Sequence, residues 1–515
     1  MVVRSSTSAP ANTSELRSID AVAVSKVLGI ETEYGISTGR PGDDPIVMST
    51  LLVNAFASKL AHHIRWDFDA ESPGADARGR VQPGSLAPMI ETHLANAVLT
   101  NGARFYVDHA HPEYSSPEVS TPLEAVRYDR AGEEVLRHAM ADVARSYPDA
   151  PPIVVFKNNS DAKGNSYGTH ENYLIARDLA FGDVIAAMVP HLVSRQVFCG
   201  AGKLGAETTS FDGPPQFQIS QRAEFFEAVV GLETTLKRPI INTRDEPHAD
   251  ATRFRRLHVI IGDANMSEVA TFLKVGTTAL LLAMLEDDGL IEAIELADPV
   301  GAVRTISADP GLNATVELAD GRTLTALEIQ EILLGQAGRY VERGGGEAIG
   351  DPSQVVEILR RWEGSLHGLA TDSPSMSATI DWVAKKRVLE AFADRHRLSM
   401  GDPKLRAMDL QYHDLRPERS IASRVGLEEL VNQNDVDRAV TEPPRGTRAY
   451  FRGSCLAKFP REVVTANWDS LVFDLGTDPL RRVPMMDPLR GTADHTEQLL
   501  GSVRSAQELL ARIES

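Results

Sequence analysis

The sequence predicts a mixed fold of the α+β class, with the size of an enzyme rather than of a small binding module. The chain has 515 residues, of which 42% are apolar and 24% charged, and this is ordinary globular composition. At roughly 150 residues per domain, the length allows about three domain-sized units. Short apolar runs of strand length are interspersed with longer runs of helical spacing, so both strands and helices are expected.

The first hundred residues predict a polar tail, a strand, a helix and a loop. Residues 1–25 are rich in Ser, Thr and Ala and lack the apolar core of a signal peptide, so we expect a disordered tail. Residues 25–35 predict a strand whose alternate acidic residues share one face. Residues 47–65 have helical spacing. Residues 71–92 contain so many Gly and Pro residues that we expect a flexible inserted loop.

Further strands follow along the chain. Residues 103–107, 153–156 and 256–262 are apolar runs that predict three of them. Residues 315–324 predict a hairpin around an Asp-Gly turn, and a capping-box pattern directly after it predicts the start of a helix.

A candidate domain boundary lies toward the C-terminus. A charged, helix-like stretch there is followed by two consecutive prolines, Pro443 and Pro444, and the chain closes with an amphipathic stretch. We therefore expect a catalytic domain over residues 26–432 and a small C-terminal domain over residues 433–515.

Composition excludes several classes of function. Acidic residues exceed basic ones by 19, which disfavours nucleic acid and anionic membrane surfaces as partners. Cys199 and Cys455 are too few for a disulfide framework and suit a reducing cytoplasm, where we expect the protein. The longest strongly apolar run, residues 275–285, is shorter than the roughly 20 residues that span a bilayer. The sequence has no Walker phosphate loop, nucleophile elbow or H-E-x-x-H zinc motif.

The sharpest chemical pattern lies on the predicted strand near residue 105. Arg104, Tyr106 and Asp108 alternate along it and therefore point to one face. His109 is a tempting proton shuttle beside Asp108, but strand alternation turns it to the opposite face, so we leave it out of the predicted site.

Four glutamates add oxygen donors near this strand. Glu113 and Glu118 follow it, and Glu31 with Glu33 forms a pair on the separate strand. Several carboxylates on one inward face would repel one another unless a divalent cation such as Mg²⁺ neutralised them. The alternative is a solvated strand that carries surface charges, and the spacing alone does not separate the two.

Two other segments are candidates for binding. Residues 158–172 form a Gly- and Asn-rich loop that ends near His170, which suits a phosphate or a metal ligand, or simply a polar turn with a surface histidine. Residues 236–265 contain six basic residues. This local excess suits a phosphate or a carboxylate-rich partner, or a solvated basic face balanced by acids elsewhere.

Six segments closely resemble the Pup-processing family, which comprises Pup deamidase/depupylases and Pup ligases and is related to glutamine synthetase. The likeness extends over essentially the whole chain after residue 26. The segments are GIETEYGIS at 29–37, TNGARFYVDHAHPEYSSPE at 100–118, NSYGTHENYL at 165–174, LETTLKRPIINTRDEPHAD at 232–250, RRLHVIIGDAN at 255–265 and RAYFRG at 448–453.

The resemblance implies a glutamine synthetase-like large domain, with a curved and mainly antiparallel sheet that forms a cradle and is backed by helices, plus a small C-terminal domain. It implies ATP and Mg²⁺ as cofactors. The metal ligands that it implies are Glu31, Tyr106, Glu113, His170 and His258, with Glu33 as a weaker candidate. The residues that it places near the nucleotide are Gly35, Arg104, Ser116, Arg256 and Trp468.

The resemblance implies a hydrolase rather than a ligase. Family ligases lack an insertion before the Arg-x-Tyr-x-Asp strand, whereas Glu31 and Arg104 are 73 positions apart here. Asp108 matches the catalytic aspartate, which either attacks the side-chain carbonyl carbon of the C-terminal residue of Pup or activates water for that attack. The expected reactions are deamidation of the C-terminal Gln of Pup and cleavage of the isopeptide bond to substrate lysines.

Pup and pupylated proteins are the expected partners. Pup is small, acidic and disordered, so residues 237–256 are expected to contribute to a basic groove that binds it. We expect a monomer that binds neither nucleic acid nor membrane. The alternatives are a Pup–protein ligase, which would consume ATP stoichiometrically, and a catalytically inactive Pup-binding adaptor.

Overall fold

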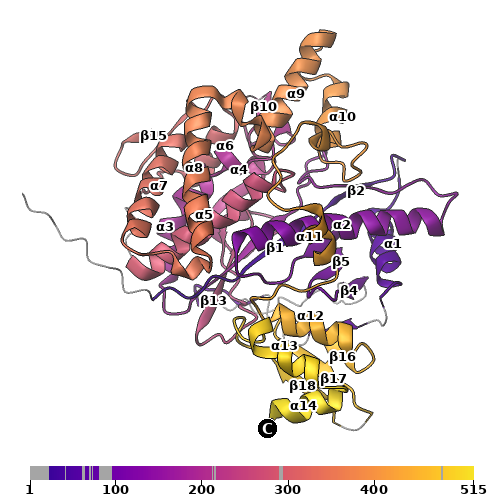
Figure 1. Cartoon of the computed structure of the whole chain (residues 1–515). Coiled ribbons are helices and arrows are strands. Elements are labelled where there is room, and N and C mark those ends of the chain that lie inside the picture. Colours follow the sequence, from indigo (N-terminus) through magenta and orange to yellow (C-terminus); the bar gives the residue numbers. More distant parts are fainter. Residues whose placement is uncertain are drawn as a thin grey trace, which may run out of the picture.

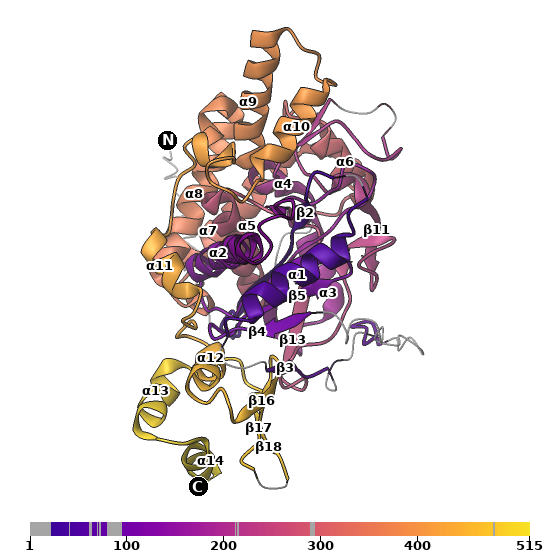
Figure 2. The same ribbon diagram turned by 90° about the vertical axis from the view of Figure 1, so that its right-hand side faces the viewer.

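The structure, a computed structural model, describes residues 22–40, 42–60, 64–68, 71, 74–79, 95–211, 213, 216–288, 294–476 and 479–514. These form a large α+β unit and a smaller lobe made mainly of the C-terminal residues (Figures 1 and 2). Most of the predicted tail, residues 1–21, and residues 80–92 of the predicted inserted loop lie outside the described residues.

An eight-stranded sheet is the centre of the large unit. All of its neighbouring strands are antiparallel except β11 and β12, which pair in parallel. In spatial order the strands are β11 (Phe226–Gly231), β12 (Arg238–Asn242), β13 (Phe254–Val259), β8 (Thr169–Ala176), β1 (Leu28–Glu33), β6 (His111–Ser115), β5 (Arg104–Asp108) and β4 (Asn96–Val98). The predicted α+β class with a mainly antiparallel sheet is confirmed.

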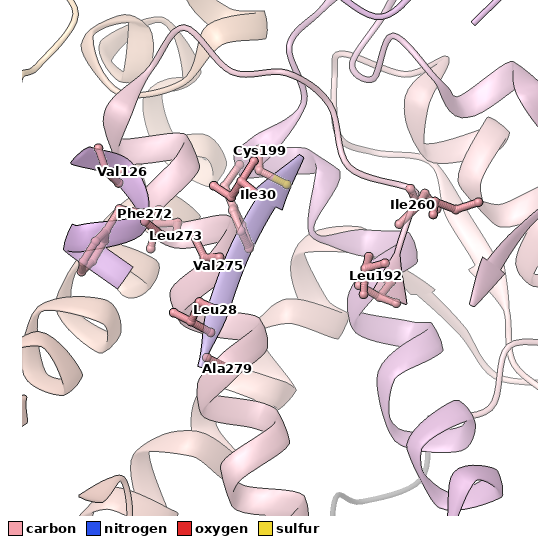
Figure 3. Packing of buried hydrophobic residues seen from close by; sticks show 14 of the residues in the cluster. Leu28, Ile30, Val126, Leu192, Cys199, Ile260, Phe272, Leu273, Val275 and Ala279 are labelled. Carbon is pink, nitrogen blue, oxygen red and sulfur yellow. The ribbon is translucent and has the colours of Figure 1, made fainter. Parts of the chain in front are cut away.

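Helices cover the apolar face of this sheet. α2 (Pro122–Ser146), α3 (Phe181–Ser194) and α5 (Glu268–Asp288) pack against its strands. Leu28 and Ile30 of β1 point toward α5 (Figure 3). The opposite, polar face of the sheet is thereby left for the site described below.

The further helices surround this core. α1 (Pro45–Ala57) packs on β4, β5 and β6, and α7 (Ala326–Glu342) and α8 (Pro352–Asp372) form an outer layer over α3 and α5. The others in the large unit are α4 (Gln196–Cys199), α6 (Pro299–Ser307), α9 (Asp381–His396), α10 (Pro403–Tyr412) and α11 (Gln433–Ala439).

Local sequence explains where several helices begin. Asp44 and Thr121 accept hydrogen bonds from the first-turn amides of α1 and α2, and in both helices a proline occupies the first turn, where its missing N–H costs nothing. The predicted capping box of Thr325 and Glu328 is present at the start of α7. It follows the predicted hairpin, whose strands are β14 (Thr315–Glu317) and β15 (Thr323–Thr325).

α5 is longer than the apolar run that the sequence analysis singled out. By length and composition it could cross a membrane, alone among the described helices, but its apolar window is entirely buried within the fold. Two predicted elements also differ in detail. The helix predicted over residues 47–65 ends at Ala57, and the strand predicted at residues 153–156, β7 (Val154–Phe156), pairs with β2 (Gly35–Ser37) outside the main sheet.

The C-terminal lobe has its own apolar cluster and its own sheet. α12 (Ala449–Lys458), α13 (Ala493–Ser502) and α14 (Ala506–Glu514) lie to one side of a four-stranded sheet (Figure 2). In spatial order its strands are β18 (Arg481–Pro484), β17 (Ser470–Phe473), β16 (Val463–Ala466) and β3 (Arg65–Trp66). β3 comes from the N-terminal part of the chain and pairs in parallel with β16, so the lobe is not continuous in sequence. The predicted boundary at residue 433 stays a prediction.

Candidate functional site

Five adjacent strands present polar side chains on the open face of the large sheet. Along β1, residues 28, 30 and 32 are buried while Glu31 and Glu33 point the other way. Along β5, Phe105 and Val107 are buried while the predicted trio that starts at Arg104 points to the open face. The predicted alternation on both strands is confirmed. β6, β8 and β13 bring the remaining polar groups alongside.

Glu31 lies at the centre of a group of partners. Its carboxylate is 3.3 Å from Nδ1 of His170 and 3.8 Å from Nε2 of His258. Asn172 donates a hydrogen bond to it at 2.8 Å, and a guanidinium nitrogen of Arg256 lies 3.7 Å away. Burial alone would raise the pKa of Glu31, but its interactions with the facing side chains, the hydrogen bond with His170 foremost, lower it well below its usual value. Glu31 is therefore ionised.

His258 suits a metal ligand. Its side chain is only 2% exposed, yet neither ring nitrogen has a hydrogen-bond partner, and buried polar atoms without partners are rare in native proteins. Burial lowers the pKa of His258 to about 3, so the ring is neutral, as a metal ligand must be. Ligand atoms of Glu31, His170 and His258 lie within 4.8 Å of one another. This donor set could hold a divalent cation.

Tyr106 and Glu113 face each other across β5 and β6. The Tyr106 hydroxyl donates to Oε1 of Glu113 at 2.5 Å. Burial and the nearby carboxylates, that of Asp108 foremost among them, raise the pKa of Glu113 well above its usual value. Like charges crowded in this way would be relieved by a cation. The five predicted metal ligands thus lie on neighbouring strands, and their role as ligands stays a prediction.

Asp108 and Glu33 form a second group together with His109. Ligand atoms of the three lie within 4.8 Å of one another. Burial and the Asp108 charge raise the pKa of Glu33 to about 8. Burial opposes ionisation of Asp108 as well, but its hydrogen bond with His109 lowers its pKa. The pair therefore holds Asp108 as the anion and Glu33 as the acid near neutral pH. Gly168 donates its N–H to Glu33 at 2.7 Å.

The expectation that His109 points away from the site is wrong. Its Nδ1 lies 3.0 Å from Oδ2 of Asp108. Strand alternation ends at Asp108, because His109 occupies the turn before β6 with a φ of 51°. This left-handed backbone returns the side chain to the carboxylate. A search for alternating residues cannot detect a positive φ. The two-residue turn between paired strands was nevertheless an indication, because such turns often require positive φ values.

A hollow beside Glu31 brings together most of the predicted nucleotide residues. Ser116, Arg256 and Trp468 line it. Asn172, Glu118, His248 and Arg448 also line it and were missed as nucleotide-site residues. Of these, Arg448 lies in the RAYFRG segment already noted at residues 448–453, and Asn172 lies two residues after His170 and so on the same strand face.

Arg104 lies next to this hollow in an aromatic clamp. Its guanidinium is 4.3 Å from the ring centroid of Trp66 and 3.8 Å from that of Tyr106. Trp66 in turn contacts Trp468 edge to face at 5.1 Å. The C-terminal lobe, to which both tryptophans belong, thereby reaches the large sheet.

Gly35 lies apart from the other predicted nucleotide residues. It lines a different cavity of about 950 Å³, together with His111 and Tyr167. A Cβ on Gly35 would lie 2.3 Å from Oδ1 of Asn158 and 2.5 Å from the Tyr167 hydroxyl. Close packing is the physical reason that residue 35 is a glycine. Gly35 is not among the residues that line the hollow beside Glu31.

Glu118 was a candidate oxygen donor for a metal, but in the structure its carboxylate binds two arginines. Its carboxylate accepts hydrogen bonds from Arg448 at 2.8 Å and from Arg452 at 3.1 Å. Burial opposes its ionisation, but these two cations lower the pKa of Glu118 to about 2. Glu118 therefore joins the large unit to α12.

The basic stretch at residues 237–256 is partly engaged within the fold. Arg238 and Arg255 donate to backbone oxygens, Arg253 pairs with Asp487 at 2.9 Å, and Arg256 faces Glu31. The groove that would bind Pup stays a prediction.

Comparison with known proteins shows the family to which this chain belongs. The model of the Pup-ligase protein family matches residues 26–472. The depupylase of Acidothermus cellulolyticus is 50% identical over 507 residues, which cover 95% of this chain and 99% of that protein. The Pup deamidase/depupylase of Mycobacterium tuberculosis is 47% identical, with the same coverage. The Pup–protein ligase of Acidimicrobium ferrooxidans is 40% identical, over 79% of this chain and 90% of that protein.

Solved structures share the fold. A Pup ligase PafA in complex with Pup superposes with a TM-score of 0.77 at 31% identity and covers 95% of this chain and 94% of its own. PafA in complex with ADP gives a TM-score of 0.71 at 34% identity, over 80% of this chain and 91% of its own. The chain belongs to the Pup-ligase protein family.

Proposed function

We propose that this protein is an amidohydrolase that deamidates the C-terminal Gln of Pup to Glu and cleaves the isopeptide bond between Pup and substrate lysines. One observation carries the choice of reaction. Identity to proteins named depupylase or Pup deamidase/depupylase is higher, and runs over more of the chain, than identity to the Pup ligase. The ionised, partly exposed Asp108 beside an acidic Glu33 supports the same choice.

Asp108 is the proposed catalytic group. As an anion it attacks the side-chain carbonyl carbon of the terminal Gln or Glu, or takes a proton from a water that does so. Glu33, held protonated, stabilises that anion and keeps one negative charge rather than two at the point of attack. Gly168 fixes Glu33 through its N–H. Arg222, fully buried, faces Glu33 with its positive charge.

Nucleotide binding is supported by the likeness to PafA bound to ADP. We propose that ATP occupies the hollow lined by Ser116, Arg256 and Trp468, beside Arg104. We propose Mg²⁺ at Glu31, His170 and His258, with Tyr106 and Glu113 next to it. When bound, the cation supplies positive charge that polarises an oxygen. Because amide hydrolysis is downhill in water, the nucleotide acts as a cofactor that need not be consumed in each cycle.

The test follows both reactions by mass spectrometry. Pup ending in Gln and a pupylated protein are each incubated with the protein, ATP and Mg²⁺, and an Asp108→Asn variant is run beside the wild type. We expect conversion of Gln to Glu and release of the free target by the wild type only. Attachment of Pup to lysines with stoichiometric loss of ATP would instead establish a ligase. An unchanged substrate would favour a Pup-binding adaptor.

A further inference from the structure

His109 occupies an unfavourable backbone conformation at the edge of the site. It is the first residue of the turn between β5 and β6, where Asp108 pairs with His111. Its φ of 51° lies in the left-handed region, which glycine or asparagine adopts more easily than histidine. Strained residues of this kind cluster at functional sites. The strain here aims an imidazole at the catalytic carboxylate.

The surroundings of His109 differ from those of the other histidines nearby. Its side chain is 58% exposed, whereas that of Asp108 is 23% exposed, so the imidazole lies between the carboxylate and solvent. His170 and His258 face Glu31 instead. The His111 ring lies against Tyr167, with centroids 4.2 Å apart. Among the histidines in the described residues, His109 alone has an ion-pair contact with Asp108.

Hydrolysis of an amide needs a proton donor at the nitrogen. When the C–N bond breaks, its electron pair stays on nitrogen, and neither ammonia nor a lysine side chain can leave as an anion. Asp108 is ionised and cannot supply that proton, and the proton of Glu33 is donated to Asp108, while the other side of its carboxyl group accepts the N–H of Gly168. A positioned imidazolium is a common solution to this requirement.

We propose that His109 is the catalytic acid that protonates the leaving nitrogen of the isopeptide or the Gln side chain. Its Nδ1–H bonds to Asp108, and the proton on Nε2 passes to the nitrogen as the C–N bond breaks. If Asp108 has formed an acyl intermediate, water then attacks it, the water proton passes to solvent, and the C–O bond to Asp108 breaks. If Asp108 acts as a base, the proton that it takes from water passes to solvent, and solvent reprotonates Nε2 of the exposed His109.

The charged and titratable groups that face His109 fit this cycle. Asp108 contacts the His109 ring, and ligand atoms of Glu33 and His109 lie within 4.8 Å of each other. His111 is close enough to His109 for the two rings to interact electrostatically. The Asp108 carboxylate lies 3.0 Å from Nδ1 of His109, and burial lowers the pKa of His111 to about 4, so His111 adds no competing positive charge near neutral pH. The inference rests on the proposed hydrolase function.

Leaving-group dependence tests the proposal. His109→Asn keeps a residue that tolerates the left-handed backbone, and His109→Gln keeps a side-chain amide, but neither can titrate. Two substrates are compared in the holoenzyme with ATP and Mg²⁺: a pupylated protein, and Pup whose terminal Glu carries a γ-4-nitrophenyl ester, whose phenolate leaves without a proton. We expect both variants to lose at least about 100-fold in kcat on the isopeptide but less than about fivefold on the ester.

Equal losses on both substrates, or undiminished isopeptide cleavage, would overturn the proposal. Because Glu33, Asp108 and His109 also have the spacing of a metal site, Mn²⁺ affinity is measured for each variant. A fall in affinity that parallels the loss of activity would assign His109 to a metal instead. His138→Asn, at an exposed histidine on α2, is the matched control. An inactive wild type would refute the hydrolase function itself, whereas active His109 variants would refute only this inference.

Discussion

Replacing Glu118 with glutamine removes the only negative charge in a buried group of three side chains. The carboxylate of Glu118 bonds both Arg448 and Arg452, whose side chains are 3% and 0% exposed. Glu118→Gln keeps the volume and leaves two buried guanidinium groups without that partner. Removing one member of a buried ion pair is far more costly than removing the pair together.

The magnitude follows from the pKa of Glu118. The two cations shift it from 4.5 to about 2 against the effect of burial, and this difference corresponds to about 3 kcal/mol of unfolding free energy. Because the folded-state pKa lies below the unfolded one, this stabilisation is complete above pH 4.5 and is lost as the pH falls toward 2. About half of it should remain near pH 3.

Urea unfolding monitored by tryptophan fluorescence measures this effect. At pH 7 the free energy of unfolding of Glu118→Gln should be lower than that of the wild type by about 3 kcal/mol, and the difference should shrink toward pH 3. Glu497→Gln is the control, because Glu497 also pairs with an arginine, Arg445, but at the exposed surface; it should change little. A Glu118 variant as stable as the wild type at pH 7, or a difference that grows at low pH, would refute the reasoning.

Three further changes test other parts of the structure. Trp66→Leu removes one face of the clamp around Arg104, so the ADP dissociation constant measured by calorimetry should rise about 2- to 30-fold. Unchanged affinity would show that the clamp does not contribute to nucleotide binding. His258→Phe keeps a buried ring without nitrogens, and Mn²⁺ affinity measured by electron paramagnetic resonance should fall at least about tenfold, whereas equal affinity would remove His258 from the metal site. Leu282→Ala, fully buried in α5, should lower the free energy of unfolding by about 2–5 kcal/mol in urea titrations; a loss below about 1 kcal/mol would contradict the packing described.

The strands of the site were predictable because alternation is a property of extended backbone. Glu31 with Glu33, and Arg104 with Tyr106 and Asp108, point to the open face as their spacing requires. The same rule failed one residue beyond the strand. The direction of a side chain in a turn depends on a single φ, which the pattern of apolar residues does not encode.

Contacts between distant segments were not predictable from local pattern. Glu118 looked like another oxygen donor, but its partners lie more than 300 residues further along the chain. The resemblance placed Gly35 near the nucleotide, but the neighbouring Asn158 and Tyr167 leave no room there for a side chain, and this close packing explains the glycine. The resemblance to a family predicted the arrangement of the sheet, which composition and spacing alone left open.

The pairing of β3 with β16 constrains how the protein is made. Ala466 lies opposite Trp66, 400 positions later in the chain. At about 5–20 residues per second, the ribosome needs roughly 20–80 s between synthesising these two partners. Throughout that interval the segment around Trp66, which includes the apolar Ile64 and Phe68, has no sheet to join. The nascent chain therefore exposes this segment until synthesis is nearly complete, and it is there that a chaperone would be most useful.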